Sequence, residues 1–450
     1  MSATVPVVEA QSGREPWPSR QAAYYALAVI ILATMLNFFD AQVFGIMGQR
    51  IKIDLHLSDE QLGFLIGPAN VIFYVLVGIP MARLVDMYPR KIVLACGIAL
   101  IGGITALGGL AQSFKQLFSS RMLVGAGGSA HAPGAYSMLA DCFPPARLPR
   151  AIGILQLGFI GGNTLGIYLG GHLTSLAATW PVAHWMGLTV RGWQWILMMV
   201  GAPGLLISGL LLLAKEPARR GTAAHGKPLP VRAVFREIAA RKAIYLPLFV
   251  GLAFSATQAI GIQPWLAPFL IRTYGWNEAK IGNLMGLMFL VSSLIGAAFG
   301  TVFVEWLSKR YKDAHVRAST ILFAAAAPFQ IAAPLMPSGG LALLFIGAAG
   351  VCGLASAVPQ NAAIQRITPN EMRGQITAIY LFMFIVFGAL GSQLIGSITQ
   401  RVFGSDADLR KTIVLTASVL MPLAALAISR GIRPYGREVE RLEALESKTG

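Results

Sequence analysis

Long runs of apolar residues, separated by short polar segments, make up most of this chain. Each run is long enough to cross a bilayer as a helix, which takes roughly 20 residues. The pattern therefore predicts an all-α membrane protein with twelve transmembrane helices, six in each half of the chain. The predicted spans are residues 24–47, 62–82, 92–112, 117–140, 151–177 and 192–214, then 243–271, 281–304, 318–335, 340–364, 376–398 and 412–428.

The composition excludes an ordinary soluble protein. Of the 450 residues 55% are hydrophobic and only 12% are charged, whereas a soluble domain carries about 25% charged residues. Cys96, Cys142 and Cys352 lie in or beside apolar runs, and their spacing suggests neither a metal site nor a disulfide framework. We find no nucleotide-binding loop, nucleophile motif or sizeable soluble segment. We therefore expect no cofactor, no metal and no enzymatic activity.

The formal net charge of +16 reflects membrane topology rather than nucleic-acid binding. Most of the 36 lysines and arginines fall in the alternate loops that are cytoplasmic if both termini are cytoplasmic, as the positive-inside rule requires. The first 22 residues contain no apolar core, so we expect no cleaved signal peptide. The short loops favour a bacterial inner membrane.

These features divide the chain into five parts. We expect a cytoplasmic tail at 1–22, a six-helix bundle at 23–214, a basic linker at 215–242, a second bundle at 243–430 and a cytoplasmic tail at 431–450. In the linker, apolar and basic residues between 229 and 242 separate onto two sides of a helix. This pattern predicts a helix on the inner membrane surface. A mobile linker is the alternative.

A charged motif recurs at the same loop of each half. Asp86-x-x-x-Arg90-Lys91 follows the second span, and Glu305-x-x-x-Lys309-Arg310 follows the eighth. Internal repeats of this kind are typical of transporter folds. The two halves are therefore expected to form pseudo-symmetric bundles.

The first copy of this motif extends from Ala82 to Lys91 and resembles the loop signature of the major facilitator superfamily. The chain departs from that signature at Ala82, Met87 and Pro89. The resemblance implies two bundles that rock about a central site. The motifs at 86–91 and 305–310 would then act as a latch on the cytoplasmic side.

Three ionisable residues lie inside predicted spans, where an uncompensated charge is costly. Asp40 in the first span and Arg121 in the fourth should lie at nearly the same depth, because those spans run in opposite directions. We expect them to pair, either as a proton-responsive coupling pair or as a static structural ion pair. His131 is either a second proton site or substrate contact, or a neutral histidine bonded to a backbone carbonyl.

Four further segments indicate one branch of this superfamily. They are Asn37-Phe-Phe-Asp40, Arg121-Met-Leu-Val-Gly-Ala-Gly-Gly-Ser-Ala-His-Ala-Pro, Leu139-Ala-Asp141-Cys-Phe-Pro-Pro and Gly192-Trp-Gln-Trp. They are similar to the spinster branch of the superfamily. The resemblance implies transport of lysolipid-like or sphingoid-like molecules, with proton coupling through Asp40 and Arg121. Two departures, Ala41 for an arginine and Gly128 for a glutamate, put that coupling in question unless His131 supplies the missing site.

Polar and aromatic residues deep in the spans are the candidates for substrate binding, although helix–helix contacts are the common role of such polar residues. The strongest two are Asn163 and Gln258, and the others are Asn70, Tyr74, Gln156, Gln263 and Trp265. The prediction is a monomeric proton-coupled transporter of a small amphipathic molecule. A coupled symporter of small organic anions, whose carboxylate Arg121 would bind, and an uncoupled facilitator are the alternatives.

Overall fold

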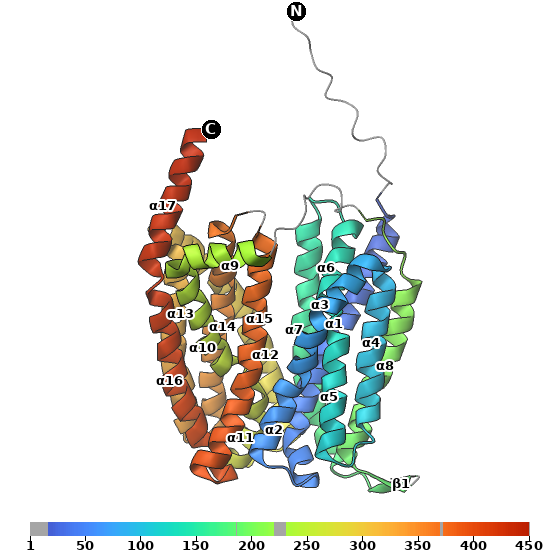
Figure 1. Ribbon diagram of the computed structural model, residues 1–450. Coiled ribbons are helices and arrows are strands. Elements are labelled where there is room, and N and C mark those ends of the chain that lie inside the picture. The colour runs from blue at the N-terminus through green and yellow to red at the C-terminus, as the bar shows by residue number, and fades with distance from the viewer. Residues whose placement is uncertain (1–16, 186, 220–230, 370–371, 450) are drawn as a thin grey trace, which may run out of the picture.

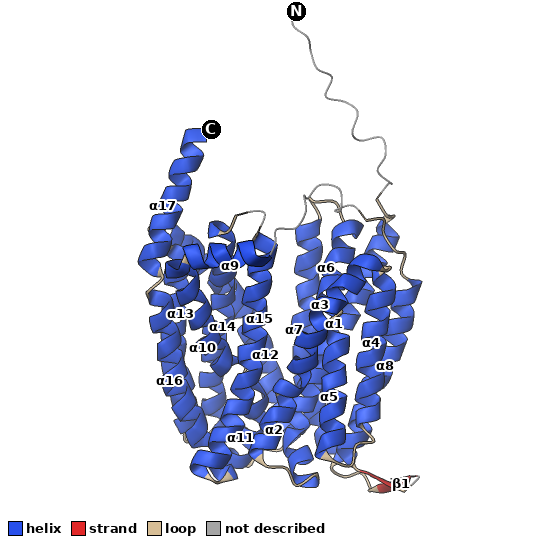
Figure 2. Cartoon of the chain, viewed as in Figure 1, coloured by secondary structure: helices blue, strands red, loops and turns tan. Residues whose placement is uncertain are grey.

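The computed structural model describes residues 17–185, 187–219, 231–369 and 372–449. Two bundles of long, nearly parallel helices stand side by side, and the two ends of the described chain, at the start of α1 and the end of α17, lie at the same end of the molecule (Figures 1 and 2). The N-terminal bundle contains α1 (Arg20–Asp54), α2 (Asp59–Ile66), α3 (Pro68–Met87), α4 (Arg90–Gly108), α5 (Phe114–Gly128), α6 (His131–Cys142), α7 (Leu148–Ala177) and α8 (Gly192–Leu213).

The C-terminal bundle contains α10 (Lys242–Ala259), α11 (Leu266–Tyr274), α12 (Glu278–Ser308), α13 (Ala314–Ala332), α14 (Gly339–Ile367), α15 (Arg373–Ile398) and α16 (Leu409–Ser429). Single turns lie at Gln263–Trp265, Ala333–Leu335, Thr399–Phe403 and Asp406–Asp408. A small hairpin pairs β1 (Ala183–Trp185) with β2 (Leu188–Val190), with Ala183 opposite Val190. The predicted all-α architecture with six crossings in each half is confirmed.

Eleven helical segments of the described chain are long and apolar enough to cross a membrane. The twelfth crossing, predicted as one helix at 117–140, is divided between α5 and α6. Two causes are local. Gly125, Gly127 and Gly128 weaken the helix, and Pro133 cannot donate to a carbonyl four residues back. A Cβ atom at Gly127 would lie 2.7 Å from the Gly97 carbonyl oxygen, so the glycines also let α4 approach closely.

Two other spans predicted as single helices are also interrupted. The second divides at Gly67, where Pro68 begins α3, and the seventh divides before Pro264. Side-chain caps start several neighbouring helices: Ser58 forms a capping box with Gln61 at α2, and Asn277 caps α12. Proline and glycine thus place short, broken helices at the end of the molecule opposite the termini.

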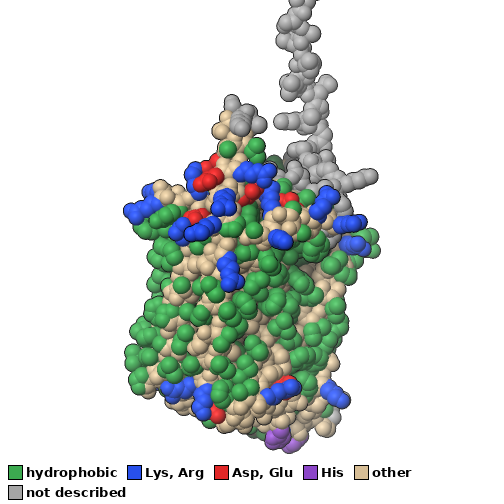
Figure 3. Space-filling view, turned by 60° about the vertical axis from the view of Figure 1, so that its left-hand side comes forward, with side chains coloured by type: hydrophobic (Ala, Val, Ile, Leu, Met, Phe, Trp, Pro, Cys, Tyr) green, Lys and Arg blue, Asp and Glu red, His purple; other side chains and the backbone are tan. Residues whose placement is uncertain are grey.

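On the face shown in Figure 3, a broad band of hydrophobic side chains lies between two charged rims. The rim nearer the termini is the richer in lysine and arginine in this view, in keeping with the predicted orientation. After this predicted orientation, we name this end the cytoplasmic end and the opposite end the outer end.

Two further helices lie at the cytoplasmic end. α9 (Val231–Ala240) runs across the C-terminal bundle, and α17 (Ile432–Thr449) continues beyond α16 (Figure 1). Val234 of α9 and Tyr435 of α17 are buried in one apolar cluster. The predicted amphipathic segment is therefore a helix over Val231–Ala240. Residues 220–230 of the linker lie outside the described residues.

The two bundles meet most closely where α7 packs against α12 and α2 packs against α15. On α7, a Cβ atom at Gly171 would lie 2.6 Å from the Cα atom of Gly282 on α12. The backbones of these two helices are therefore in direct contact. His172 Nε2 beside this contact donates a 2.8 Å hydrogen bond to the Asn283 side-chain oxygen across the boundary.

Candidate functional site

Asp40 and Arg121 form a buried ion pair inside the N-terminal bundle. Arg121 Nη1 donates to Asp40 Oδ2 over 3.0 Å, and both side chains are almost completely buried. Thr105 on α4 connects the two, because its hydroxyl donates to Asp40 Oδ1 at 2.9 Å and accepts from Arg121 Nη2 at 3.1 Å. The Phe44 ring lies 4.5 Å from the guanidinium carbon. We call these four residues the Asp40 cluster.

The Asp40 cluster joins three helices through one carboxylate. α1 supplies Asp40 and Phe44, α4 supplies Thr105, and α5 supplies Arg121. Hydrogen bonds to the remaining positions of a buried ion pair offset part of its desolvation cost. Thr105 supplies one such bond to each partner, whereas Arg121 Nε has no hydrogen-bond partner among the described residues. The sequence predicted the pairing of Asp40 with Arg121. It did not identify Thr105 or Phe44, although Thr105 is the one threonine in the apolar run 92–112.

His131 begins α6, directly after the break in the fourth crossing. Its Nε2 lies 2.8 Å from the Thr34 hydroxyl oxygen, and that hydroxyl donates to the Ile30 carbonyl at 2.8 Å. Nε2 is therefore the donor to Thr34, which leaves Nδ1 as an acceptor. Nδ1 is buried and has no hydrogen-bond partner in the described structure. The partner of His131 is thus a hydroxyl, not the backbone carbonyl that was one of the predicted alternatives.

His131 lies apart from the Asp40 cluster. Its partner Thr34 precedes Asp40 by six positions on α1, which is about 9 Å along a helix. Thr34 is on the cytoplasmic side of Asp40. His131 therefore contacts α1 at a depth different from that of Asp40.

Gly128 lies at a corner where three helices meet. A Cβ atom there would lie 3.8 Å from both the Asn37 side-chain oxygen of α1 and the Tyr74 ring of α3. Asn70, one turn before Tyr74, lies against Gly125 so closely that a Cβ atom at Gly125 would overlap the Asn70 carbonyl. Two predicted substrate contacts, Asn70 and Tyr74, are thus placed beside the glycine-rich part of α5.

The other predicted substrate contacts lie in different surroundings. Asn163 on α7 is buried, donates to the Phe159 carbonyl at 2.8 Å and accepts from Gln42 at 2.7 Å. Gln258 on α10 is fully buried, and its amide has no hydrogen-bond partner in the part of the chain that the structure describes.

Three more candidates complete this set. Gln156 is exposed and Gln263 is half-buried. Trp265 is fully buried and donates to the Ser392 carbonyl at 3.0 Å. It packs between α2 and α15, where the two bundles touch, because Cβ atoms at Gly63 and Gly396 would both lie close to its ring.

Charged side chains join the two bundles at the outer end. Asp59 of α2 is fully buried and accepts from Lys52 at 2.7 Å and from Arg272 of the other bundle at 2.7 and 2.8 Å. We call the ion pairs of this region the outer seal. Its members are Arg50 with Glu278, Lys52 with Asp59 and Asp406, Asp59 with Arg272, and Glu60 with Arg401.

The repeated loop motifs make their contacts within each half. Arg90 is buried and binds Asp141 of its own bundle and Glu216 at the start of the linker. Lys91 donates to the Leu212 and Ala214 carbonyls at 3.1 Å. The remaining members, Asp86, Glu305, Lys309 and Arg310, are exposed.

The positions of the ion pairs between the two bundles show which end of the molecule is closed. Among the described residues, the ion pairs that join the two halves all belong to the outer seal. In the part of the chain that the structure describes, charge pairing between the two halves therefore closes the outer end only.

Two six-helix bundles, an ion pair buried in one of them and an ionic closure at one end define a membrane transporter. The chain belongs to the Major Facilitator Superfamily, whose model matches residues 30–392. Members of this family are carriers, not enzymes, and move small molecules by alternately opening each face. The protein is thus an integral, multi-pass membrane transporter that works by alternating access.

Comparison with individual proteins supports the resemblance to the spinster branch. The chain is 25% identical to an MFS-type efflux pump of Mycolicibacterium smegmatis, over 98% of this chain and 99% of that protein. It is 23% identical to Protein spinster of Drosophila melanogaster, over 89% of this chain and 65% of that protein. The crystal structure of a bacterial homologue of the human lysosomal transporter Spinster shares the fold, with a TM-score of 0.76 and 24% identity over 94% of this chain and 98% of that one.

Proposed function

We propose that the protein is a proton-coupled transporter of a small amphipathic or lipid-like molecule of the lysolipid or sphingoid class. The observation that carries this proposal is the Asp40 cluster. Asp40 is 4% exposed and is held by one cation and one hydroxyl. Adding a proton to this carboxylate removes the charge that binds Arg121. Proton binding and the packing of α1, α4 and α5 are then linked.

The length of α1 offers a route from the proton site to the outer seal. α1 is one helix of 35 residues that carries Asp40 in its middle and Lys52 near its end. The twelve positions between them correspond to about 18 Å. A shift of α1 that follows release of Arg121 would therefore move Lys52 relative to Asp59 and Asp406, its partners in the outer seal.

The substrate class rests on two arguments. Relatives that match nearly the whole chain include a spinster protein and an efflux pump. In addition, Asp40 already neutralises Arg121, so in this state the arginine is not free to bind a substrate carboxylate. This weighs against the organic-anion alternative. The deep polar residues Asn163 and Gln258 remain our proposed substrate contacts, together with Asn70, Tyr74, Gln156, Gln263 and Trp265.

We also propose the latch, orientation and oligomeric state that the sequence predicts. The exposed residues Asp86, Glu305, Lys309 and Arg310 would pair with the facing bundle when the outer seal opens, with Arg90 and Lys91 holding the loop in place. Both termini would face the cytoplasm of a bacterial inner membrane, with the protein acting as a monomer.

Proton release or uptake on ligand addition tests the proposed function. Purified protein in detergent with a pH dye would receive lysolipids, long-chain amines, or mono- and dicarboxylates. We expect a proton signal with an amphipathic ligand, lost in Asp40→Asn and kept in Glu440→Gln, which changes an exposed acid of α17. Ligand binding without proton movement in the wild type would contradict coupling. A signal only with carboxylates would establish the organic-anion alternative.

Gly128 allows a gain-of-function prediction. A Cβ atom at this buried corner would lie at normal contact distances from Asn37 and Tyr74, and Gly128→Glu places a second carboxylic acid there. We expect the number of protons moved per substrate to rise toward twice the wild-type value in reconstituted vesicles. Gly128→Gln is the control of equal size without an ionisable group. Equal stoichiometry in both variants would show that position 128 takes no part in proton transfer.

A further inference from the structure

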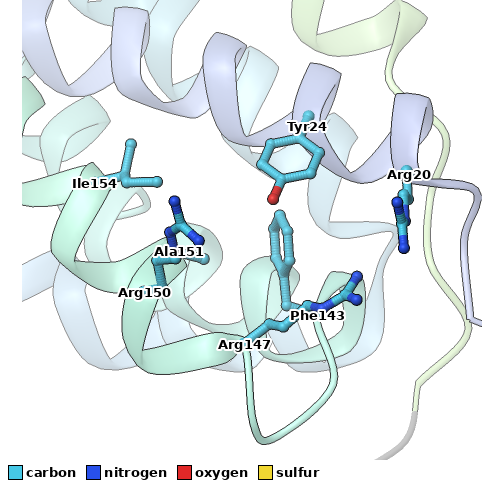
Figure 4. Close-up of a pocket in the computed structure, with 7 residues that line it drawn as sticks. All are labelled: Arg20, Tyr24, Phe143, Arg147, Arg150, Ala151 and Ile154. Atoms are coloured by element: carbon cyan, nitrogen blue, oxygen red, sulfur yellow. The ribbon is translucent and has the colours of Figure 1, made fainter.

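A basic pocket opens at the cytoplasmic end of the N-terminal bundle, away from the Asp40 cluster. It lies where the first turns of α1 and α7 meet the loop that follows α6, and its volume is about 280 Å³ (Figure 4). Its lining consists of Arg20, Tyr24, Phe143, Arg147, Arg150, Ala151 and Ile154.

Three positive charges in this pocket have no neutralising partner among the residues that the structure describes. Arg20, Arg147 and Arg150 are exposed and make no ion pair with a described residue. Asp141, a nearby acid of α6, binds the buried Arg90. The pocket also adjoins the N-terminal ends of two long helices, which carry partial positive charge. An anion in this pocket would therefore gain several favourable interactions and displace no internal carboxylate.

The floor of the pocket is apolar. Tyr24 and Phe143 pack edge to face with ring centres 5.5 Å apart, and Ala151 and Ile154 continue the same surface. Figure 4 shows the arginines distributed around this aromatic pair. Tyr24 is half exposed, as is typical of tyrosines at the boundary between the headgroups and the hydrocarbon. Basic groups beside an apolar surface at this level suit a molecule with an anionic head and apolar chains.

We propose that this pocket binds the phosphate headgroup of an anionic phospholipid from the cytoplasmic leaflet. The arginines contact the phosphate oxygens, for which the guanidinium geometry is well suited, and the aromatic pair contacts the glycerol and the first acyl carbons. Basic pockets on the cytoplasmic side of helix bundles have this chemistry. The bound lipid connects the start of α1 to the start of α7, the helix that contacts the other bundle. The site is independent of the proposed proton coupling and rests only on the proposed orientation.

Native mass spectrometry of delipidated protein, titrated with phosphatidylglycerol or phosphatidylcholine, tests this site. We expect preferential binding of phosphatidylglycerol, weakened at least tenfold in the triple variant Arg20→Gln, Arg147→Gln, Arg150→Gln. The matched control is Arg430→Gln, Arg433→Gln, Arg437→Gln. It removes the same charge from exposed positions at the same end of the other bundle and should bind like the wild type.

Each other outcome overturns the proposal. Equal weakening in both triple variants would mean general attraction to cationic protein, and unchanged binding in the pocket variant would place the lipid elsewhere. Full displacement of phosphatidylglycerol by millimolar inorganic phosphate or glycerol 3-phosphate would identify a site for free phosphate instead. Size-exclusion profiles and thermal unfolding verify that each variant is folded. Absence of a ligand-induced proton signal from the wild type would contradict only the proposed function and would leave the lipid site untouched.

Discussion

Replacing Arg121 with glutamine is expected to destabilise the folded protein by about 3–5 kcal/mol, the cost of leaving one member of a buried ion pair without its partner. Asp40 is almost fully buried and would keep only the Thr105 hydroxyl as a donor. The midpoint of thermal unfolding in detergent, followed by tryptophan fluorescence, measures the effect. It should fall by several degrees relative to the wild type.

The double variant Asp40→Asn, Arg121→Gln provides the decisive comparison. Both charges are absent from it, so the penalty of the isolated carboxylate disappears. We expect it to recover most of the lost stability while remaining inactive in the proton assay. If the double variant is as unstable as Arg121→Gln, the guanidinium stabilises the bundle by packing against Phe44 and not by neutralising Asp40.

Asp59→Asn should open the outer end. In the present state the Asp59 carboxylate is fully buried and receives three hydrogen bonds from Lys52 and Arg272, which belong to different bundles. Asparagine leaves these two cations close together without a shared anion. A change of 1.4 kcal/mol in the free-energy difference between the two states changes the ratio of their populations tenfold. The free-energy cost of removing one partner of a buried ion pair is larger than 1.4 kcal/mol.

Cysteine labelling measures this opening. In a chain whose three natural cysteines are serine, Ser392→Cys places a thiol at a buried position beside Trp265. A membrane-impermeant maleimide added outside should react at least about tenfold faster when Asp59→Asn is also present. The control is Asp408→Asn, an outer acid paired with Lys411 of the same turn, because such surface pairs contribute little. Equal rates in the two variants would show that the Asp59 contacts do not determine closure.

The number and length of the apolar runs were sufficient to predict an all-α membrane protein and the number of its membrane crossings. Helix length and depth arithmetic was sufficient to place Asp40 beside Arg121. These inferences succeed because a bilayer fixes the length of each element and penalises unpaired charge. Thr105 could not be predicted in the same way, since its role depends on how α4 is rotated about its axis. That rotation is set by packing against its neighbours, which a hydropathy pattern does not record.

The outer seal was missed for a different reason. Lys52, Asp59 and Arg272 stand at the ends of predicted spans, where charges ordinarily face water. Asp59 lies at the contact between the two bundles, where it is fully buried and bound to Arg272 of the other bundle. The helix breaks carried a local signal, because Gly67-Pro68, Pro133 and Pro264 lie within the runs concerned. Proline is nevertheless tolerated in many membrane helices, and Pro203 lies inside the unbroken α8.

The backbone contact between Gly171 and Gly282 has a mechanical consequence. The contact lies near the outer end of α7, and the helix extends 23 residues from it toward the cytoplasm, a lever of about 35 Å. A tilt of about 10° about this point would carry the cytoplasmic tip through roughly 6 Å, by the same helix geometry. Parts of the outer seal that lie close to the Gly171–Gly282 contact would move far less. Thermal rocking of the bundles can therefore widen the cytoplasmic end while the outer end stays closed.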